Sequence, residues 1–297
     1  MLIDLHTHTS CSDGTDSPSE LVAAAVAAGL DVIALTDHDT AAGWTSALAA
    51  AEGTDLVLLP GMEISCQHQG VGVHLLAYLV DPHQAALAKE LTKVLAGRSS
   101  RLPAILERLR ALGIDIDVAD VRRVAGNTAA TGRPHVADAL IALGVVRDRD
   151  EAFSRYLVAG RPAYVRRYAP DLTGMLALVA RAGGVPVLAH PWGRSSRTVL
   201  DPATIAGLAA AGLVGLEVDH RDHGPADRVE LHALADQLGL VATGSSDYHG
   251  SGKVAHELGC ETTPPGQLAR LLERAGTSAE RARSTGANPP PLPSLSL

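Results

Sequence analysis

Short apolar runs that alternate with helix-length segments are the feature that most restricts the fold of this 297-residue chain. Seven such runs are apolar along most of their length, which is typical of strands that are buried on both faces. They cover residues 2–5, 32–35, 56–59, 73–79, 185–189, 214–218 and 240–242. Strands of this kind, separated by helices, indicate an α/β fold with a mostly parallel sheet that is closed, or nearly closed, as a barrel.

The segments between these runs carry signals for helix starts and stops. Ser17-Pro18-Ser19-Glu20 combines an N-cap serine, a proline at the first helical position and the glutamate of a capping box. Gly29 and Gly239 stand where helices are expected to end. Aromatic residues make up only 3% of the chain, so the core must be packed mainly with small and branched aliphatic side chains.

The middle of the chain has a different pattern. Helical segments dominate there, and the sequence predicts a small helical domain inserted into the barrel as a lid. The expected organisation is a first barrel part, the lid, a second barrel part and a Pro- and Ser-rich tail that is disordered. These parts cover residues 1–86, 87–165, 166–277 and 278–297 respectively.

Composition and charge narrow the function classes. The net charge of −8 argues against a broad basic surface for duplex DNA. No apolar stretch is long enough to cross a membrane, so no membrane association is expected, and the absence of a leader favours the cytoplasm. Three cysteines without CxxC spacing favour free thiols in a reducing compartment. No segment indicates an obligate protein partner.

Residue types that bind metals follow five of the seven runs. A single histidine at such a place is more often a buried core residue, but five strand ends with His, Asp or Glu favour a metal site, because the carboxyl ends of barrel strands form one face. Without a thiolate among them, imidazole and carboxylate ligands suit Mn, Fe or Zn. Asp37 and Asp39 are expected to orient neighbouring ligands. The five groups are His6 with His8, Asp37 to Asp39, Glu63, His190, and Asp247 with His249.

The ordered motifs resemble the PHP (polymerase and histidinol phosphatase) superfamily. They are His6-x-His8, Ser12-Asp13-Gly14, Leu35-Thr36-Asp37-His38-Asp39, Gly61-Met62-Glu63, His190-Pro191 and Asp247-x-His249. The resemblance implies a distorted (β/α)7 barrel that holds two or three divalent metal ions, with Mn expected first.

Carried over residue by residue, the resemblance implies three metal sites, with Glu63 as a bridge between two of them. His74 lies inside its apolar run, so a buried structural histidine is the alternative there. The first site has His6, His8, Glu63 and Asp247, the second has Asp13, His38 and His249, and the third has Glu63, His74 and His190.

Metal ions held close together lower the pKa of a bridging water, and the hydroxide would attack the phosphate. Glu63 and Asp247 are therefore expected to be catalytic as ligands, and His223 is the candidate proton donor for the leaving alcohol. Arg98 and Arg101 are expected to be ordinary surface charges. Candidate substrate-binding residues are Arg133, His135 and Arg194.

Within the superfamily, Gly132-Arg133-Pro134-His135, Ala163-Tyr164-Val165 and Ala189-His190-Pro191-Trp192 resemble a branch with a helical insertion. The resemblance implies a small nucleotide substrate, a 3′,5′-bisphosphonucleotide such as pAp, or short 5′-phosphorylated RNA. A histidinol phosphatase is the alternative enzyme, although a compact substrate needs no lid. A non-catalytic metal-binding module is the alternative outside enzymes.

Overall fold

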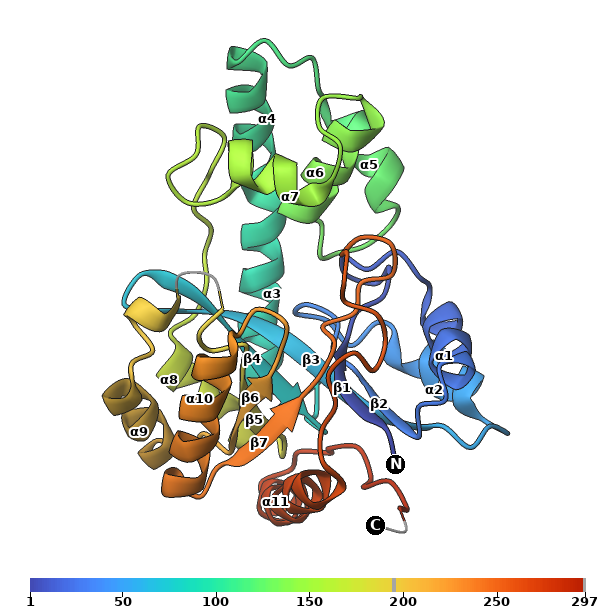
Figure 1. Ribbon diagram of the computed structural model, residues 1–297, viewed down its shortest axis with the longest axis vertical. Coiled ribbons are helices and arrows are strands. Elements are labelled where there is room, and N and C mark those ends of the chain that lie inside the picture. Colours follow the sequence, from blue (N-terminus) through green and yellow to red (C-terminus); the bar gives the residue numbers. More distant parts are fainter. Residues whose placement is uncertain (194–195, 296–297) are drawn as a thin grey trace.

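Seven strands form one sheet in the order of the sequence, β1 to β7, in the computed structural model, which describes residues 1–193 and 196–295. The two edges of the sheet approach each other, because the His8 N–H donates to the Tyr248 carbonyl just beyond β7, at 2.8 Å. The predicted α/β barrel is thus confirmed as a nearly closed one (Figure 1). Its strands are β1 Ile3–Thr7, β2 Val32–Leu35, β3 Val57–His68, β4 Val71–Tyr78, β5 Val185–Ala189, β6 Gly215–Asp219 and β7 Val241–Gly244.

The fourth strand departs from the predicted parallel arrangement. β3 does not end near residue 59 but continues through Glu63 to His68, and β4 pairs antiparallel with both β3 and β5. Only Gln69 and Gly70 connect β3 to β4, both with positive φ (48° and 81°). A two-residue turn of this kind joins antiparallel strands, whereas parallel neighbours need a crossover of a dozen residues or more.

Helices cover the outside of the barrel, and one helix closes its lower end. The Ser17 capping box is present, since Glu20 Oε2 accepts from the Ser17 N–H at 2.8 Å. Leu268 and Leu271 of α11 pack with apolar residues inside the barrel, such as Ile3 and Val187. This packing lies at the end of the barrel away from the lid (Figure 1). The barrel helices are α1 Pro18–Ala27, α2 Trp44–Ala51, α8 Leu172–Arg181, α9 Pro202–Ala210, α10 Pro225–Leu238 and α11 Pro265–Arg283.

The described part of the C-terminal segment also differs from the expectation of a disordered tail over residues 278–297, of which 296–297 lie outside the described residues. α11 continues to Arg283, and the Asn288 N–H donates to Asp81 Oδ2 at 2.8 Å. Leu295 packs against the apolar residues inside the barrel. Composition predicts disorder here, but these contacts give the segment partners that composition does not reveal. Within the described residues, no helix combines the length and the apolar character that crossing a bilayer requires.

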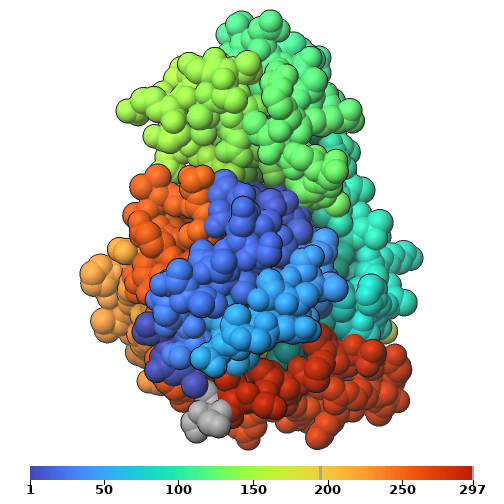
Figure 2. Space-filling view, turned by 90° about the vertical axis from the view of Figure 1, so that its right-hand side faces the viewer, coloured from blue at the N-terminus to red at the C-terminus, as the bar shows by residue number. Residues whose placement is uncertain are grey.

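The helical segment between β4 and α8 forms a lid above the barrel (Figure 1). The lid has a hydrophobic core of its own, which includes Ile105, Leu109, Val136, Leu140 and Leu157. Figure 2 shows the lid seated on the loops of the first and last barrel strands. Its elements are α3 Ala85–Ser100, α4 Leu102–Ala111, α5 Val118–Ala125, α6 Arg133–Ala142, α7 Arg149–Ala152 and a π-helical turn Phe153–Leu157.

Candidate metal centre

The structure brings together all nine residues that the sequence singled out as metal ligands, at the end of the barrel that faces the lid. Most of them are at most 8% exposed, and His74 is half-buried. Six of the seven strands contribute, and β6 supplies none of the nine. The residues of β1, β2, β5 and β7 lie at the strand end or in the loop after it, whereas β3 and β4 contribute from within the strand. The nine are His6, His8, Asp13, His38, Glu63, His74, His190, Asp247 and His249.

Glu63 lies at the centre of this cluster. Its Oε1 is 2.7 Å from His74 Nδ1 and 3.0 Å from His190 Nε2. Its Oε2 is 3.0 Å from His38 Nδ1 and 3.3 Å from His8 Nε2. One carboxylate thus faces histidines on two sides, as a bridging ligand would.

His74 reaches the cluster because β4 runs antiparallel. The first half of β4 lies at the same end of the barrel as the carboxyl ends of the parallel strands, and His74 pairs in register with Ser65, two residues beyond Glu63. The rule that ligands follow the carboxyl ends of strands assumed parallel neighbours. By that rule His74 is badly placed to be a ligand, whereas the structure puts it beside Glu63.

Asp13 and Asp247 complete the acidic part of the cluster. Asp13 Oδ1 is 3.4 Å from His249 Nε2, and its Oδ2 is 3.6 Å from His38 Nε2. Asp247 Oδ1 is 3.4 Å from His8 Nε2. Burial alone would raise the pKa of the Asp13 carboxyl, but His38 and His249 beside it lower that pKa well below its ordinary value.

The hydrogen bonds of the histidines fit divalent ions. His6 Nδ1 lies 2.9 Å from Glu217 Oε1, and His249 Nδ1 lies 2.8 Å from the Asp247 carbonyl, so in both rings Nδ1 is the donor. Their Nε2 lone pairs then point into the cluster. His6 Nε2 is only 3.0 Å from His8 Nε2. Imidazole nitrogens and carboxylate oxygens that converge in this way form the donor set of a metal site.

The backbone at this end of the barrel is strained. Asp39, His190 and Asp247 have positive φ values of 59°, 28° and 53°, which non-glycine residues rarely adopt. Each such residue costs on the order of 1–3 kcal/mol and persists where the surroundings hold it in place. At His190 the N–H donates to Glu217 Oε2 at 2.8 Å, so the bent backbone is fixed by a buried carboxylate.

Two residues of this centre were not identified from the sequence. Glu217 of β6 is fully buried and accepts hydrogen bonds from His6, the His190 backbone and Ser245. Lys253 forms an ion pair with Asp247 and lines the cleft above the cluster. Glu217 lies near the end of β6, three residues before His220, and this position was the signal that could have identified it.

Asp37 and Asp39, which were predicted to orient neighbouring ligands, both have hydrogen-bond partners close to the cluster. Asp37 Oδ1 accepts from the Thr9 N–H at 2.8 Å and from Ser12 Oγ at 2.6 Å, so it holds the loop that carries Asp13. Asp39 Oδ2 accepts from Arg98 Nε at 2.6 Å. Neither carboxylate faces the centre of the cluster directly.

The position of His223 does not fit the predicted role of proton donor. Its Nδ1 donates to the Val218 carbonyl at 2.8 Å, and its Nε2 accepts from the Trp192 N–H at 3.1 Å. Burial lowers the pKa of the ring, so it is neutral, and its single proton is held by the backbone. His223 therefore fastens the loop after β6 to the loop after β5. Its position at a strand end did not reveal which way the ring points.

The three residues predicted to bind the substrate differ in where they lie relative to the cleft. Arg133 lines the cleft between the lid and the barrel, which has a volume of about 840 Å³. His135 instead lines a separate small cavity, and its Nδ1 accepts from the Gly132 N–H at 3.1 Å, so the structure does not place it in the cleft. Arg194 lies outside the described residues.

Arg98 and Arg101 are not surface charges, contrary to the prediction. Their exposed fractions are 4% and 6%, because the lid folds back over the barrel and covers them, and both line the cleft. Burial, with Arg133, Arg167 and Arg98 nearby, lowers the pKa of Arg101 to about 8. Burial and neighbouring Arg98 lower the pKa of Arg167 to about 10. The cleft thus carries a concentrated positive charge next to the metal cluster.

A buried cluster of imidazoles and carboxylates below a basic cleft defines a hydrolase of the metal-dependent phosphoesterase class. Residues 4–108 match the family model described as PHP domain. The chain is 33% identical over 271 residues to the 3′,5′-nucleoside bisphosphate phosphatase of Chromobacterium violaceum, covering 89% of this chain and 93% of that protein. The protein belongs to the PHP family and is a metal-dependent phosphoesterase.

Two further likenesses extend over most of the chain. A 5′-3′ exoribonuclease of Haemophilus influenzae is 32% identical over 246 residues, which are 83% of this chain and 89% of that protein. A solved structure from Bifidobacterium adolescentis, described as a metal-dependent phosphoesterase, has a TM-score of 0.87 at 37% identity. It covers 92% of this chain and 96% of that one. The predicted class of enzyme is therefore confirmed.

Proposed function

We propose that this enzyme hydrolyses a phosphate ester of a nucleotide that carries a second phosphate, with 3′,5′-bisphosphonucleotides such as pAp as the substrate class. The arginines that share the cleft with the metal cluster are the observation that carries the proposal. A phosphate at the cluster leaves the rest of the substrate under the lid, where a second anion meets these guanidinium groups. The similarity to a 3′,5′-nucleoside bisphosphate phosphatase supports the same substrate class.

The arginines in the cleft are suited to an anion that arrives with the substrate. Arg98 is already paired with Asp39, at 2.6 Å. Among the described residues, Arg101 Nε is buried without a hydrogen-bond partner. A buried unpaired guanidinium N–H is costly, and a phosphate oxygen satisfies it. Arg133 is stacked against Phe153 and Tyr164, at 5.5 and 5.7 Å from the ring centroids, which fixes the direction of its guanidinium.

The metal ligands of the proposal are the nine clustered residues, with two or three divalent ions and Mn as the expected metal. When bound, such ions lower the pKa of a water molecule and neutralise charge on the phosphoryl oxygens. The residues themselves hold the geometry. Glu63 faces two histidine groups, Glu217 fixes the tautomer of His6, and the lid arginines orient the substrate.

Short 5′-phosphorylated oligoribonucleotides are a second candidate. The cleft volume of about 840 Å³ leaves room for more than one nucleotide, and a relative of similar identity is named a 5′-3′ exoribonuclease. Both substrates present a second phosphate to the arginines.

The test is to compare phosphate release from pAp, adenosine 3′-monophosphate, a 5′-phosphorylated trinucleotide and histidinol phosphate in the presence of Mn. We expect kcat/KM for pAp to exceed that for the 3′-monophosphate by about one decade or more, because a charge-assisted contact contributes roughly 1.5–3 kcal/mol. Equal values for these two would exclude a role for the second phosphate. A preference for histidinol phosphate would favour the alternative, a histidinol phosphatase.

A further inference from the structure

The loop that carries Asp13 is tightly folded but has carbonyls that point outward. Within the loop, the N–H groups of Ser12 and Gly14 both donate to the Thr9 carbonyl, at 2.9 and 3.0 Å. A side chain at Gly14 would lie 2.5 Å from the His8 carbonyl, so the loop packs directly on the strand end that bears His8. The carbonyls of Cys11 and Asp13 do not take part in these bonds, and both meet the lid.

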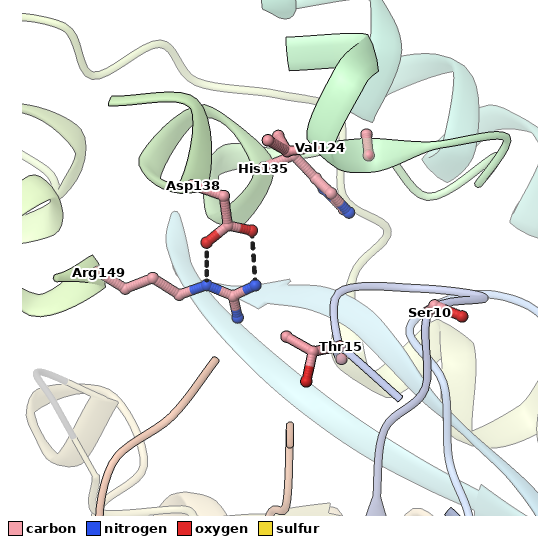
Figure 3. Close-up of a pocket in the computed structure, with 8 residues that line it drawn as sticks. Ser10, Thr15, Val124, His135, Asp138 and Arg149 are labelled. Atoms are coloured by element: carbon pink, nitrogen blue, oxygen red, sulfur yellow. Dashed lines mark hydrogen bonds and ion pairs between the residues drawn. The ribbon is translucent and has the colours of Figure 1, made fainter. Parts of the chain in front are cut away.

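Arg149 of the lid binds the second of these carbonyls. Its Nη1 donates to the Asp13 carbonyl at 3.0 Å. Its Nε and Nη2 donate to the two carboxylate oxygens of Asp138 in α6, at 2.6 and 2.7 Å (Figure 3). This bidentate pair fixes the plane of the guanidinium, so the third nitrogen is aimed at one place. The Arg149 side chain is only 12% exposed.

Two further contacts join the lid to the loops that carry metal ligands. Thr128, between α5 and α6, donates its hydroxyl to the Cys11 carbonyl at 2.6 Å. The Arg149 guanidinium also packs on Gly252, where a Cβ would lie 2.5 Å from Nη1. Gly252 follows Asp247 and His249 in the last loop, so Arg149 contacts two of the loops that supply the proposed ligands around Asp13.

A small cavity separates the remaining parts of the lid from this loop. Its volume is about 160 Å³, and its lining includes Ser10, Thr15, His135 and Arg149 (Figure 3). The loop is therefore not packed continuously against the lid at this place. The bonds from Thr128 and Arg149 bridge the two parts at the edge of the cavity, in addition to the bonds by which Asp37 holds the loop from the barrel side.

We propose that Arg149, oriented by Asp138, is a positioning residue for the metal ligand Asp13. It acts by holding the Asp13 carbonyl, and with it the direction in which the carboxylate points toward His38 and His249. The lid would then be part of the metal site as well as a cover for the substrate. Groups that orient a ligand from behind typically change metal affinity about 10- to 100-fold when they are removed. The inference holds whichever nucleotide is the substrate.

The test compares Arg149→Met, Asp138→Asn and Thr128→Val with Arg147→Met, a matched control. Arg147 lies two residues away, and its side chain is 85% exposed in an ion pair with Glu151. Mn binding is measured by chelator competition without substrate, and hydrogen exchange of the Gly14 and Thr15 amides is measured in the metal-free protein. We expect Arg149→Met to weaken the binding of one ion about tenfold or more and to leave the ions at sites without Asp13 unchanged. Exchange at the loop amides should be faster, and the control should match the wild type.

The outcomes separate this role from others. Unchanged Mn binding with a raised KM would show that Arg149 contacts the substrate and does not position Asp13. Equal weakening of all ions, with unfolding, would indicate a general loss of structure. Thr128→Val leaves Arg149 in place and removes the hydroxyl that donates to the Cys11 carbonyl and accepts from the Ala130 N–H, so it gives an answer even if Arg149→Met does not fold. If Thr128→Val and Asp138→Asn both bind Mn like the wild type, the proposal is wrong. Failure of the pAp preference leaves these measurements unaffected.

Discussion

His6 and Glu217 face each other inside the barrel, with Nδ1 of the ring 2.9 Å from Oε1 of the carboxylate. The contact joins β1 to β6, which are not neighbours in the sheet. Glu217 Oε2 also accepts from the His190 N–H, so one buried carboxylate holds two of the proposed ligands.

Glu217→Gln tests this arrangement. The amide can accept only on its oxygen, and its NH₂ group would face either His6 Nδ1–H or the His190 N–H. We expect Mn affinity to fall by about tenfold or more with little change in size or shape of the side chain. Calorimetric titration of the metal-free protein measures this. Wild-type affinity in the variant would mean that His6 needs no partner at Nδ1.

Glu63→Ala should remove more than one metal ion per chain, because both carboxylate oxygens face histidines. Turnover should be abolished. Metal content by mass spectrometry of the purified protein decides the matter, with Glu230→Ala as the control, since Glu230 is an exposed partner of Arg197. A full metal complement in Glu63→Ala would contradict the bridging role.

Arg101→Met and Arg133→Ala should reduce the preference for pAp over the 3′-monophosphate. Each variant removes a cation from the cleft, so kcat/KM for pAp should fall about tenfold while the value for the monoester changes less. Metal content should stay intact. Arg123→Met, on an arginine that is 68% exposed, is the control. A loss of metal in Arg133→Ala would show that this residue acts on the cluster.

His223→Asn tests the proton donor. Because burial lowers the pKa of His223, the ring is neutral at pH 7 and gains a proton only in more acidic solution. A general acid with such a pKa would be inactive at neutral pH. We therefore expect lower stability in the variant, with the basic limb of the pH–rate profile unmoved. A shift of that limb would restore His223 as the acid.

The strands could be predicted because they are apolar on both faces, and the barrel followed from their alternation with helices. The direction of β4 could not be predicted, because Gln69-Gly70 is a weaker turn signal than Asn-Gly. In addition, Pro60-Gly61 made β3 look shorter than it is. This single error explains why His74 was the least certain ligand.

Burial of the arginines could not be predicted either. Arg98 is covered because α3 passes over Asp39, which lies 59 residues before Arg98 in the sequence. The helical pattern of α3 carries no information on a contact with so distant a residue. The ligand positions were accessible because strand ends meet at one face, and the family resemblance supplied their grouping. Ring orientation, as at His223, depends on backbone partners that only the folded chain provides.

The length of the β3–β4 turn also sets the register that brings His74 to the metal centre. Residues on one strand alternate between the two faces, so adding or deleting one residue at Gln69-Gly70 would turn His74 outward and bring Val73 or Leu75 toward Glu63. Proteins usually tolerate a change in the length of an exposed loop. Here the length of the turn is fixed by the need to keep His74 on the same face as Glu63. Descendants of this sequence are therefore free to vary the residue types of that turn more readily than their number.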